Sequence, residues 1–440
     1  MNFAWLTGLA FCAFATFTKT ESKIWAFLVA GGAGRIDRHY RHEANVCHAY
    51  HVLRNHGVPA EQIVLMMADK VAHSKDNPIP GKLFNQPNGP DVHQGVKVDY
   101  REDEGTAANF LAVLQGDEQA VRGKGSGRVL KSGPNDHIFL SFTDHGEKGH
   151  VVMPTGELHA LDLNETLTSM YNSKKYGSMV IYMEACYSGS MFENILSPNI
   201  HVYATTSANS DESSLPCYCQ NKGKLAGLCL GDQYSVGWME DSDKHPSLNN
   251  EVLEMQFEVA KRRATGSHAQ EYGDLKLGRT HFVGEYQGNK TAKPMVYPKV
   301  ASKSVPATDV HLFYLETKME NAKTEQERVK YGQLLVEAKR RRAYVDLLYQ
   351  LLPYHVGLLG QCKDEAQRLA PSFKTVLECH RSVTKSFVEK CFDFSRNPYT
   401  MKFSTLLYNI CEKMPLPQEI EAILQKFCEA NAIQFEGGIQ

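Results

Sequence analysis

Short apolar runs, separated by stretches with helical spacing, dominate the first two thirds of the chain. The runs are largely continuous rather than alternating, which is typical of strands covered on both faces. They lie at residues 24–30, 63–67, 137–143, 179–184 and 200–206. Between the first two, Val46, Ala49 and Leu53 recur with the period of a helix, as do the apolar positions of 109–114 and 161–171. Strands alternating with helices predict βαβ crossovers, and therefore an α/β fold with a mainly parallel sheet flanked by helices.

An uncharged apolar stretch at residues 2–17 begins the chain and is followed by polar residues. About 15 apolar residues are too few to span a membrane comfortably and fit the core of a signal peptide, which we place at residues 1–19. No later segment approaches 18 uninterrupted apolar residues, so we expect no transmembrane span in the mature chain. The secretory pathway permits disulfides, and it makes the sequons at Asn164 and Asn289 candidate glycosylation sites.

The residue composition changes after residue 287, so we place the α/β domain at residues 20–287. Residues 288–323 begin with three prolines among small polar side chains, which predicts a linker. Strong helix formers dominate residues 324–440, which indicates a separate helical domain. The charged run at 316–342 is most simply the solvated face of a helix.

Charge and cysteine content narrow the classes of function. Lys and Arg number 48 against 50 Asp and Glu, a net charge of −2, so the chain lacks the basic excess typical of nucleic-acid binders. Of the 11 cysteines, Cys186 is isolated, whereas five fall in the last 80 residues. A C-terminal cluster predicts a disulfide-stapled domain, while a solitary cysteine is either a core residue or a nucleophile.

Two predicted strands lead into residues suited to catalysis. The strand at 137–143 leads into His145 and Gly146, and the strand at 179–184 leads into Cys186. Because catalytic groups of open α/β sheets gather at the carboxyl ends of strands, one cleft can hold the imidazole and the thiol. A nearby imidazole lowers the pKa of a thiol or accepts its proton, which makes the cysteine a nucleophile. The backbone N–H groups of Gly146 and Cys186 are the candidate oxyanion donors.

Ordinary explanations exist for each residue alone, since a solitary cysteine is usually inert and a solitary histidine usually structural. It is their joint placement that favours catalysis. Metal ligation is the rival function for the histidine, because His145 with His150, or His48 with His51, can act as paired ligands. No further Cys/His pair with zinc spacing accompanies them, and HExxH is absent. We therefore expect no metal and no organic cofactor.

Several long motifs resemble, in the same order, the legumain family of asparaginyl endopeptidases, from the clan of caspases and gingipains. They read YRHEANVCHAYHVL, VLKSGPNDHIF, FTDHGEKG, IYMEACYSGSM and VYATTSANSDESS. The resemblance runs from about residue 25 to the C-terminus. It implies a caspase-like fold and a cysteine endopeptidase that cleaves after Asn and, at acid pH, after Asp. His145 matches the catalytic histidine, Cys186 the nucleophile, and Asp144 an aspartate that can cyclise to a succinimide.

Five further residues match the specificity pocket of the family: Arg41, His42, Glu184, Ser213 and Asp232. An Asn side chain offers one acceptor and two donors, so Arg41 on one side and Glu184 or Asp232 on the other can satisfy both ends. Leaving these buried charges unmatched is costly, so an apolar substrate residue should be rejected. A substrate Asp fits the same pocket better when it is protonated.

The sequence departs from the family at His39, where legumains usually have Asn. The Asn of the family orients the catalytic histidine, so His39 is the candidate third member of the site. A backbone carbonyl is the alternative.

The C-terminal region also resembles the family, and it matches an inhibitory prodomain that covers the active site until low pH releases it. Its four matching cysteines imply the pairs Cys379–Cys411 and Cys391–Cys428, where spacing alone leaves three connectivities. Lys402 lies near the point at which the family inserts an Arg into the specificity pocket. We expect charge pairs to hold the prodomain, and protonation of carboxylates such as Asp232 to release it.

Activation is expected by cleavage after Asn, with Asn321 as the first candidate and Asn289 as the second, which makes 288–323 an activation segment. A disulfide between Cys219 and Cys229 is a further expectation, and Cys47 is expected to be a buried core thiol. The sequence thus predicts a secreted or lysosomal zymogen, active in an acidic compartment on protein substrates with exposed Asn, through a Cys-His acyl-enzyme. The alternatives are a peptide ligase or transamidase that uses the same acyl-enzyme, and a catalytically silent secreted homologue.

Overall fold

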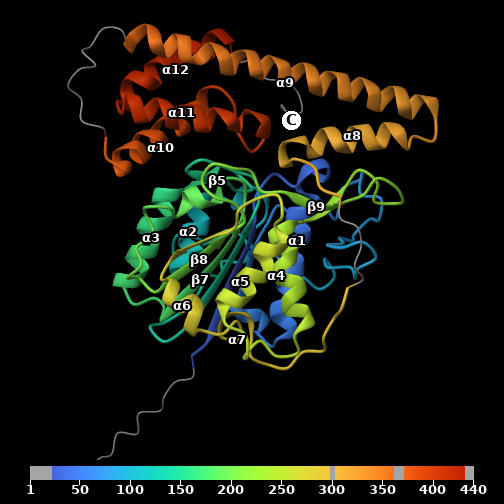
Figure 1. The fold of residues 1–440 in the computed structure, drawn as a ribbon, viewed down its shortest axis with the longest axis vertical. Coiled ribbons are helices and arrows are strands. Elements are labelled where there is room, and N and C mark those ends of the chain that lie inside the picture. The colour runs from blue at the N-terminus through green and yellow to red at the C-terminus, as the bar shows by residue number, and fades with distance from the viewer. Residues whose placement is uncertain (1–21, 298–302, 361–370, 432–440) are drawn as a thin grey trace, which may run out of the picture.

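The computed structural model describes residues 22–297, 303–360 and 371–431. The predicted signal peptide and Cys362 lie outside the described residues. The described chain forms an α/β domain, which begins at β1 (Ile24–Ala30) and ends at α7 (Gly284–Gln287), and a group of helices that follows it. Figure 1 shows these later helices, in orange and red, across one end of the α/β domain.

A six-stranded sheet forms the centre of the α/β domain, in the order β11-β8-β7-β3-β1-β2. Besides β1, its strands are β2 (Ile63–Met66), β3 (His137–Thr143), β7 (Ser178–Glu184), β8 (Val202–Thr206) and β11 (Gln270–Gly273). All neighbouring strands pair in parallel except β11, which pairs antiparallel with β8 at one edge. The five predicted runs are the five parallel strands, so the predicted sheet is confirmed.

Helices cover both faces of this sheet because each buried strand presents apolar side chains to both sides. Ala26 and Leu28 of β1 pack in one core, and Phe27 and Val29 pack in the other. The first core is closed by α1 (Ile36–Asn55), α4 (Gln233–Lys244) and α5 (Leu253–Arg263), with the short α6 (Leu275–Thr280) and α7. The second is closed by α2 (Ala107–Gln115) and α3 (Ala160–Asn172).

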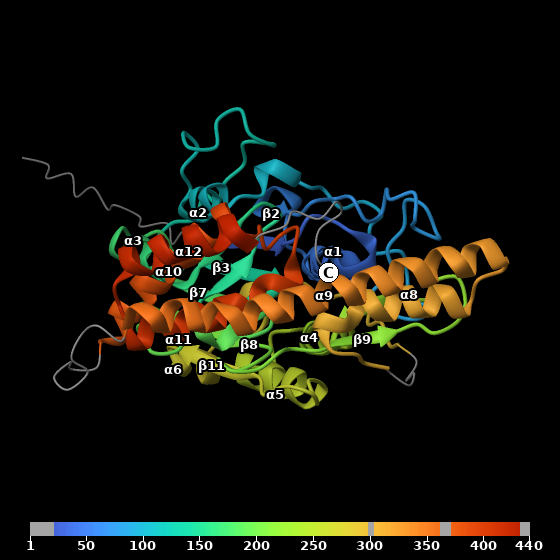
Figure 2. The same ribbon diagram turned by 90° about the horizontal axis from the view of Figure 1, so that it is seen from above.

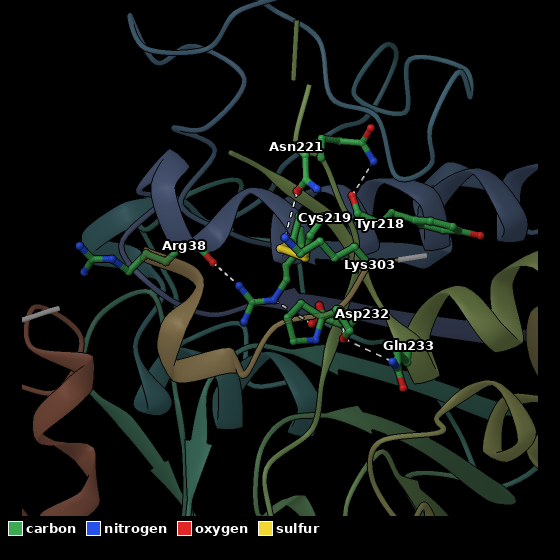
Figure 3. The surroundings of a disulfide bond; sticks show 12 residues. Arg38, Tyr218, Cys219, Asn221, Asp232, Gln233 and Lys303 are labelled. Carbon is green, nitrogen blue, oxygen red and sulfur yellow. Dashed lines mark hydrogen bonds and ion pairs between the residues drawn. A yellow bond between two sulfur atoms is a disulfide. The ribbon is translucent and has the colours of Figure 1, made fainter. Parts of the chain in front are cut away.

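Two smaller sheets extend from the ends of the central strands. One contains β4 (Gly146–Glu147), β5 (His150–Val152) and β6 (Glu157–His159); the other is the pair β9 (Pro216–Cys219) and β10 (Cys229–Asp232). Cys219 and Cys229 face each other across β9 and β10 and form a disulfide, as expected, with their Cα atoms 3.8 Å apart. Figure 3 shows this disulfide, and Asp232 lies at the end of β10. Cys47 is a free, buried thiol, also as expected.

The C-terminal region is helical, as predicted. It contains α9 (Glu325–Gly360), α10 (Phe373–Lys390), α11 (Lys402–Lys413) and α12 (Pro417–Asn431). Both disulfides implied by the family resemblance are present: Cys379–Cys411 joins α10 to α11, and Cys391–Cys428 joins the end of α10 to α12. In the described ranges, no helix is long and apolar enough to cross a membrane.

The segment predicted as a linker contains a helix of its own, α8 (Val310–Glu320). Phe313, Tyr314 and Leu315 of α8 are buried, and α8 lies alongside α9, as both views show (Figures 1 and 2). The prolines that indicate a linker all precede this helix. Only the first part of the segment therefore lacks regular structure within the described residues.

Candidate active site

Strands β3 and β7 bring the two candidate catalytic residues together, because they pair in parallel with Thr143 opposite Glu184. His145 and Cys186 each lie two residues beyond this last pair. Both side chains line a cavity of about 270 Å³, which Gly146 and Ser213 also line. The predicted convergence of imidazole and thiol at one sheet edge is therefore what the structure shows.

Burial keeps both groups uncharged in this arrangement. It raises the pKa of the Cys186 thiol to about 11, while the Sγ atom lies 3.8 Å from the Ser214 carbonyl oxygen. The pKa of His145 is held well below its usual range, first by burial and then by the charge of Arg41. The residue after His145 has to be glycine, because a Cβ on Gly146 would lie 2.5 Å from the Cys186 carbonyl oxygen.

Asp144 is buried beside the catalytic pair and contacts His42, whose Nδ1 lies 2.9 Å from Asp144 Oδ1. The same oxygen accepts a 2.5 Å hydrogen bond from the His145 backbone N–H, while Oδ2 has no partner among the described residues. Burial raises the pKa of Asp144 well above its usual value. His42, predicted for the specificity pocket, thus packs against Asp144 and against the His145 ring, 5.0 Å away between centroids.

His39 packs edge-on against His145, with 5.5 Å between ring centroids and 69° between the rings. Its Nδ1 accepts a 2.9 Å hydrogen bond from the Arg35 backbone N–H, so in the neutral ring the proton is on Nε2. Among the described contacts, none is a hydrogen bond between His39 and His145. His39 therefore touches the catalytic histidine through its ring only.

Arg41, Glu184 and Asp232 meet from three separate elements, α1, β7 and β10. Arg41 Nε lies 2.7 Å from Asp232 Oδ1. Glu184 Oε2 accepts hydrogen bonds from the backbone N–H and the hydroxyl of Ser235, at 3.0 and 3.1 Å, whereas its buried Oε1 has no partner in the described chain. Burial and the nearby Asp232 raise the pKa of Glu184 to about 8. The Arg41 guanidinium and the Glu184 carboxyl are thus both near Asp232.

Sequence reasoning missed two asparagines that support this group. Asn45 Nδ2 donates to Asp232 Oδ2 at 2.8 Å, and Asn85 Nδ2 donates to Asn45 Oδ1 at 2.8 Å. The position of Asn45 four residues after Arg41, on the same helical face, was a usable signal. Asn85 comes from the loop between β2 and α2, and no local pattern marks it.

Several other predicted residues lie apart from the site. Asn164 is buried, and its Nδ2 donates to the carbonyls of Ala160 and Met191 at 2.8 and 2.7 Å. A glycan on this nitrogen would have to replace one of the two hydrogen bonds, and glycosylation of Asn164 stays a prediction. Asn289 is exposed, as a glycan requires.

The histidines of the rival pairs make other contacts in the described chain. His48 contacts Asn85 and Asp243 through its two ring nitrogens, and His51 Nε2 lies 3.0 Å from the Val92 carbonyl oxygen. His150 packs on Phe394 of the C-terminal region, with parallel rings 5.4 Å apart between centroids. Among the described residues, three groups bring His and acidic ligand atoms within 4.8 Å of one another: His39-Asp144-His145 in the candidate active site, Asp69-His73-His93 and Asp241-His245-Glu251.

Comparison with known proteins identifies the family. The sequence model of the peptidase C13 family matches residues 24–289. This range contains all the residues of the α/β domain that line the cavity. It also contains Arg41, Glu184 and Asp232, which we call the Arg41 group. The chain belongs to the peptidase C13 family. It is a cysteine endopeptidase.

Members of this family resemble the chain over nearly its whole length. Human legumain is 42% identical over 402 residues, which is 90% of each chain. The hemoglobinase of Schistosoma mansoni is 37% identical and covers 93% of each chain, and the vacuolar-processing enzyme delta-isozyme of Arabidopsis thaliana is 38% identical over 91% of this chain and 89% of its own. Caspase-1 from Spodoptera frugiperda has a TM-score of 0.35 at 8% identity, covering 61% of this chain and 90% of that one, too distant a likeness to add to the fold described above.

The C-terminal region of this C13 peptidase contributes to the wall of the cavity that holds Cys186. Tyr399, Met401 and Lys402 line it opposite the catalytic pair. Lys402 does not enter the Arg41 group, however, because its Nζ lies 2.6 Å from Asp346 Oδ1 and over the rings of two tyrosines. Lys402 thus lies in the cavity near Cys186, as expected, and its charge is paired with Asp346 of the C-terminal region.

Contacts of three kinds join the C-terminal helices to the α/β domain. Arg381 Nη1 forms an ion pair with Asp162 Oδ1 at 2.6 Å, and Thr405 donates to Glu147 Oε1 at 3.0 Å. A buried histidine group, His150, His159 and His380, lies between the two parts, with ring centroids 5.7 and 6.3 Å apart. Apolar residues on both sides share one core.

Proposed function

We propose that this peptidase is made as a zymogen and hydrolyses peptide bonds after Asn and, in acid, after Asp. The observation that carries the proposal is the free, buried Oε1 of Glu184 beside the Arg41–Asp232 pair. An Asn amide can donate to that oxygen while its carbonyl accepts from the guanidinium. An apolar side chain would leave both groups unmatched at a large cost.

In the proposed mechanism, Cys186 attacks the substrate carbonyl and His145 takes its proton, then returns one to the leaving amine. Among the described residues, no acceptor is bonded to the Cys186 N–H, which leaves it available with the Gly146 N–H for the developing oxyanion. The acyl-enzyme is then released by water, or by an amine if the enzyme acts as a ligase.

Asp144 is the proposed site of succinimide formation. In this reaction the following backbone nitrogen attacks the side-chain carboxyl carbon, a C–O bond of the carboxyl breaks and water leaves; the His145 nitrogen lies 2.5 Å from Asp144 Oδ1. The raised pKa of Asp144 keeps the carboxyl protonated, in its more electrophilic form.

The helices α9 to α12 are the proposed inhibitory prodomain, because the region that contains them contributes to the wall of the cavity that holds Cys186. Asn321 is the proposed activation site, since it is exposed in the turn between α8 and α9. An acidic compartment of the secretory pathway is the proposed location, with a glycan on Asn289.

The decisive test measures cleavage of fluorogenic peptides ending in Ala-Ala-Asn, Ala-Ala-Asp and Ala-Ala-Leu after the full chain is acidified to about pH 4.5. We expect the Asn peptide to exceed the Leu peptide in kcat/KM by at least a hundredfold. Cys186→Ala should abolish turnover, whereas Cys47→Ala, which removes a free, buried thiol of α1, should retain it. Equal turnover of the Asn and Leu peptides would refute the specificity, and an active Cys186→Ala chain would refute the mechanism.

A further inference from the structure

A second cluster of ligand-type side chains lies in the long loop between β2 and α2, away from Cys186. Asp69 follows the end of β2, and His73 and His93 come from the same loop. One ligand atom from each of the three lies within 4.8 Å of the others. A long loop with little regular structure needs contacts that hold it in one conformation, and a bound metal ion can provide such contacts.

The two rings already have the arrangement of ligands to one tetrahedral metal. Their centroids are 5.3 Å apart and their planes cross at 80°. Two imidazoles bound to one zinc ion at about 2.0–2.1 Å place their centroids roughly 5 Å apart. The imidazole and carboxylate ligands also match the preference of zinc, whereas calcium and magnesium prefer oxygen alone.

The carboxylate is oriented as a ligand would be. His93 Nε2 lies 2.9 Å from Asp69 Oδ1, while Arg101 Nε donates to Asp69 Oδ2 at 2.9 Å and so fixes the carboxylate from behind. Metal-bound carboxylates commonly have such an outer partner. A zinc ion that replaces the shared proton would widen the 2.9 Å separation to about 3.3 Å, a small movement.

A simple histidine–carboxylate pair explains Asp69 and His93 but not His73. The exposed His268 forms such a pair with Glu212, at 2.8 Å between Nδ1 and Oε2, and has no third ligand. His73, by contrast, makes no hydrogen bond within the described chain and yet packs edge-on against His93. Because His73 is exposed and its partners are only partly buried, an ion can enter from solvent.

We propose that Asp69, His73 and His93 bind a zinc ion, with water as the fourth ligand. The ion would hold together the two ends of a loop segment that also carries Asn85, the residue that supports Asn45 and, through it, Asp232. The site is structural in this proposal and independent of the specificity proposed for the Arg41 group.

The test titrates zinc chloride into the full chain by calorimetry, with cobalt(II) absorption as a report on coordination. All proteins carry Cys186→Ser, so that the catalytic thiol neither binds metal nor processes the chain. The parent is expected to bind one zinc ion and to show the visible bands of tetrahedral cobalt. His73→Ala and His93→Ala should each weaken binding at least tenfold, while His268→Ala, which removes a histidine from a two-residue pair, should bind as the parent does.

His73 is exposed, so its replacement tests the site without disturbing a core. Zinc should also slow proteolysis within residues 67–105 of the parent and not of His73→Ala. The proposal is overturned if the parent takes up no zinc, or if His73→Ala and His93→Ala bind zinc as tightly as the parent, in which case Asp69 and His93 share a proton only.

Discussion

At the scale of single residues, the proposed catalytic histidine, His145, is surrounded by rings rather than by a carboxylate at bonding distance. Asp144 Oδ1 lies 4.0 Å from His145 Nε2 and contacts His42 instead. His39 touches the edge of the His145 ring, and the Arg35 N–H fixes the tautomer of His39. We infer that packing against these two histidines sets the orientation of His145.

Replacing His39 should therefore slow catalysis without weakening substrate binding. His39→Ala removes the ring and is expected to lower kcat by about 10- to 100-fold, because a small misplacement of His145 is costly. KM should change little, since His39 makes no contact with the Arg41–Asp232 pair in the described structure. His39→Asn should lose less, because its side-chain oxygen can accept from the Arg35 N–H in the place of Nδ1. Steady-state kinetics on the Asn peptide would decide, and an unchanged kcat for His39→Ala would rule out the positioning role.

At the scale of elements, continuous apolar runs were enough to predict the five parallel strands, since strands buried on both faces have no polar alternation to obscure them. The edge strand β11 was not predictable, because QEYG is half-buried and has no apolar run. Helix α8 was missed for a different reason. Its apolar residues pack against α9 and the α/β domain, and the preceding prolines dominated the local pattern.

The same distinction holds for the site. His145 and Cys186 follow neighbouring strands, so sheet geometry alone brought them together. The support of Arg41, Glu184 and Asp232, by contrast, includes a contact that sequence cannot show. Asn85, which lies in a loop with no periodicity, donates a hydrogen bond to Asn45, 40 positions earlier in the chain. Likewise, Asn164 satisfies the sequon, but its own helix and a neighbouring turn use its amide.

The turn between α8 and α9 makes a prediction about activation. Asn321 is exposed there, and its Nδ2 donates to the carbonyls of Asn221 and Thr317 at 3.0 and 2.8 Å. A cut after Asn321 would free α9 to α12 while α8 stays packed on α1. Asn321→Gln should slow the appearance of this cut at least tenfold, because the longer amide does not fit the proposed pocket.

Intact-mass measurement after acidification would follow this cut. Asn289→Gln is the matched control, since it makes the same change at the other exposed candidate. If Asn289→Gln blocked activation and Asn321→Gln did not, the activating cut would lie at residue 289.

At the scale of the whole molecule, buried carboxyl groups and buried histidines respond to acid in opposite ways. Burial raises the pKa of Glu43 to about 7. Burial also raises the pKa of Glu184 and of Glu251 to about 8, with a further contribution from the neighbouring Asp232 and Asp241, in that order. At these three carboxyls folding takes up protons, and the stability they contribute below a pH of about 4.5 is lost as the pH rises toward 8. The histidines between the two parts have the reverse effect.

Burial lowers the pKa of His150 to about 3 and of His380 to about 4. The joined state requires these imidazoles to be neutral, so the stability they contribute is full above a pH of about 6.5 and is lost as the pH falls toward 4 and 3. Glu147 and Glu157 lie at the same boundary, and burial raises their pKa to about 8 and about 7, which favours the joined state in acid. Their contribution is complete once the pH is below about 4.5, whereas the histidines continue to titrate.

We therefore expect the C-terminal helices to separate from the α/β domain below a pH of about 4.5. Protonation of the histidines, rather than of Asp232, is the expected trigger, because Asp232 is paired with Arg41 inside the α/β domain. His380→Gln removes one titrating ring and can still donate to the Ser404 carbonyl, which His380 Nε2 approaches at 3.1 Å. This variant should require a pH lower by roughly half a unit for separation. Small-angle scattering of the full chain carrying Cys186→Ala would follow the expansion, and His201→Gln, an exposed histidine of the α/β domain, is the control. If both variants separated at the parent's pH, the histidine group would not be the acid sensor. The carboxylates and ion pairs at the boundary would then have to cause the separation.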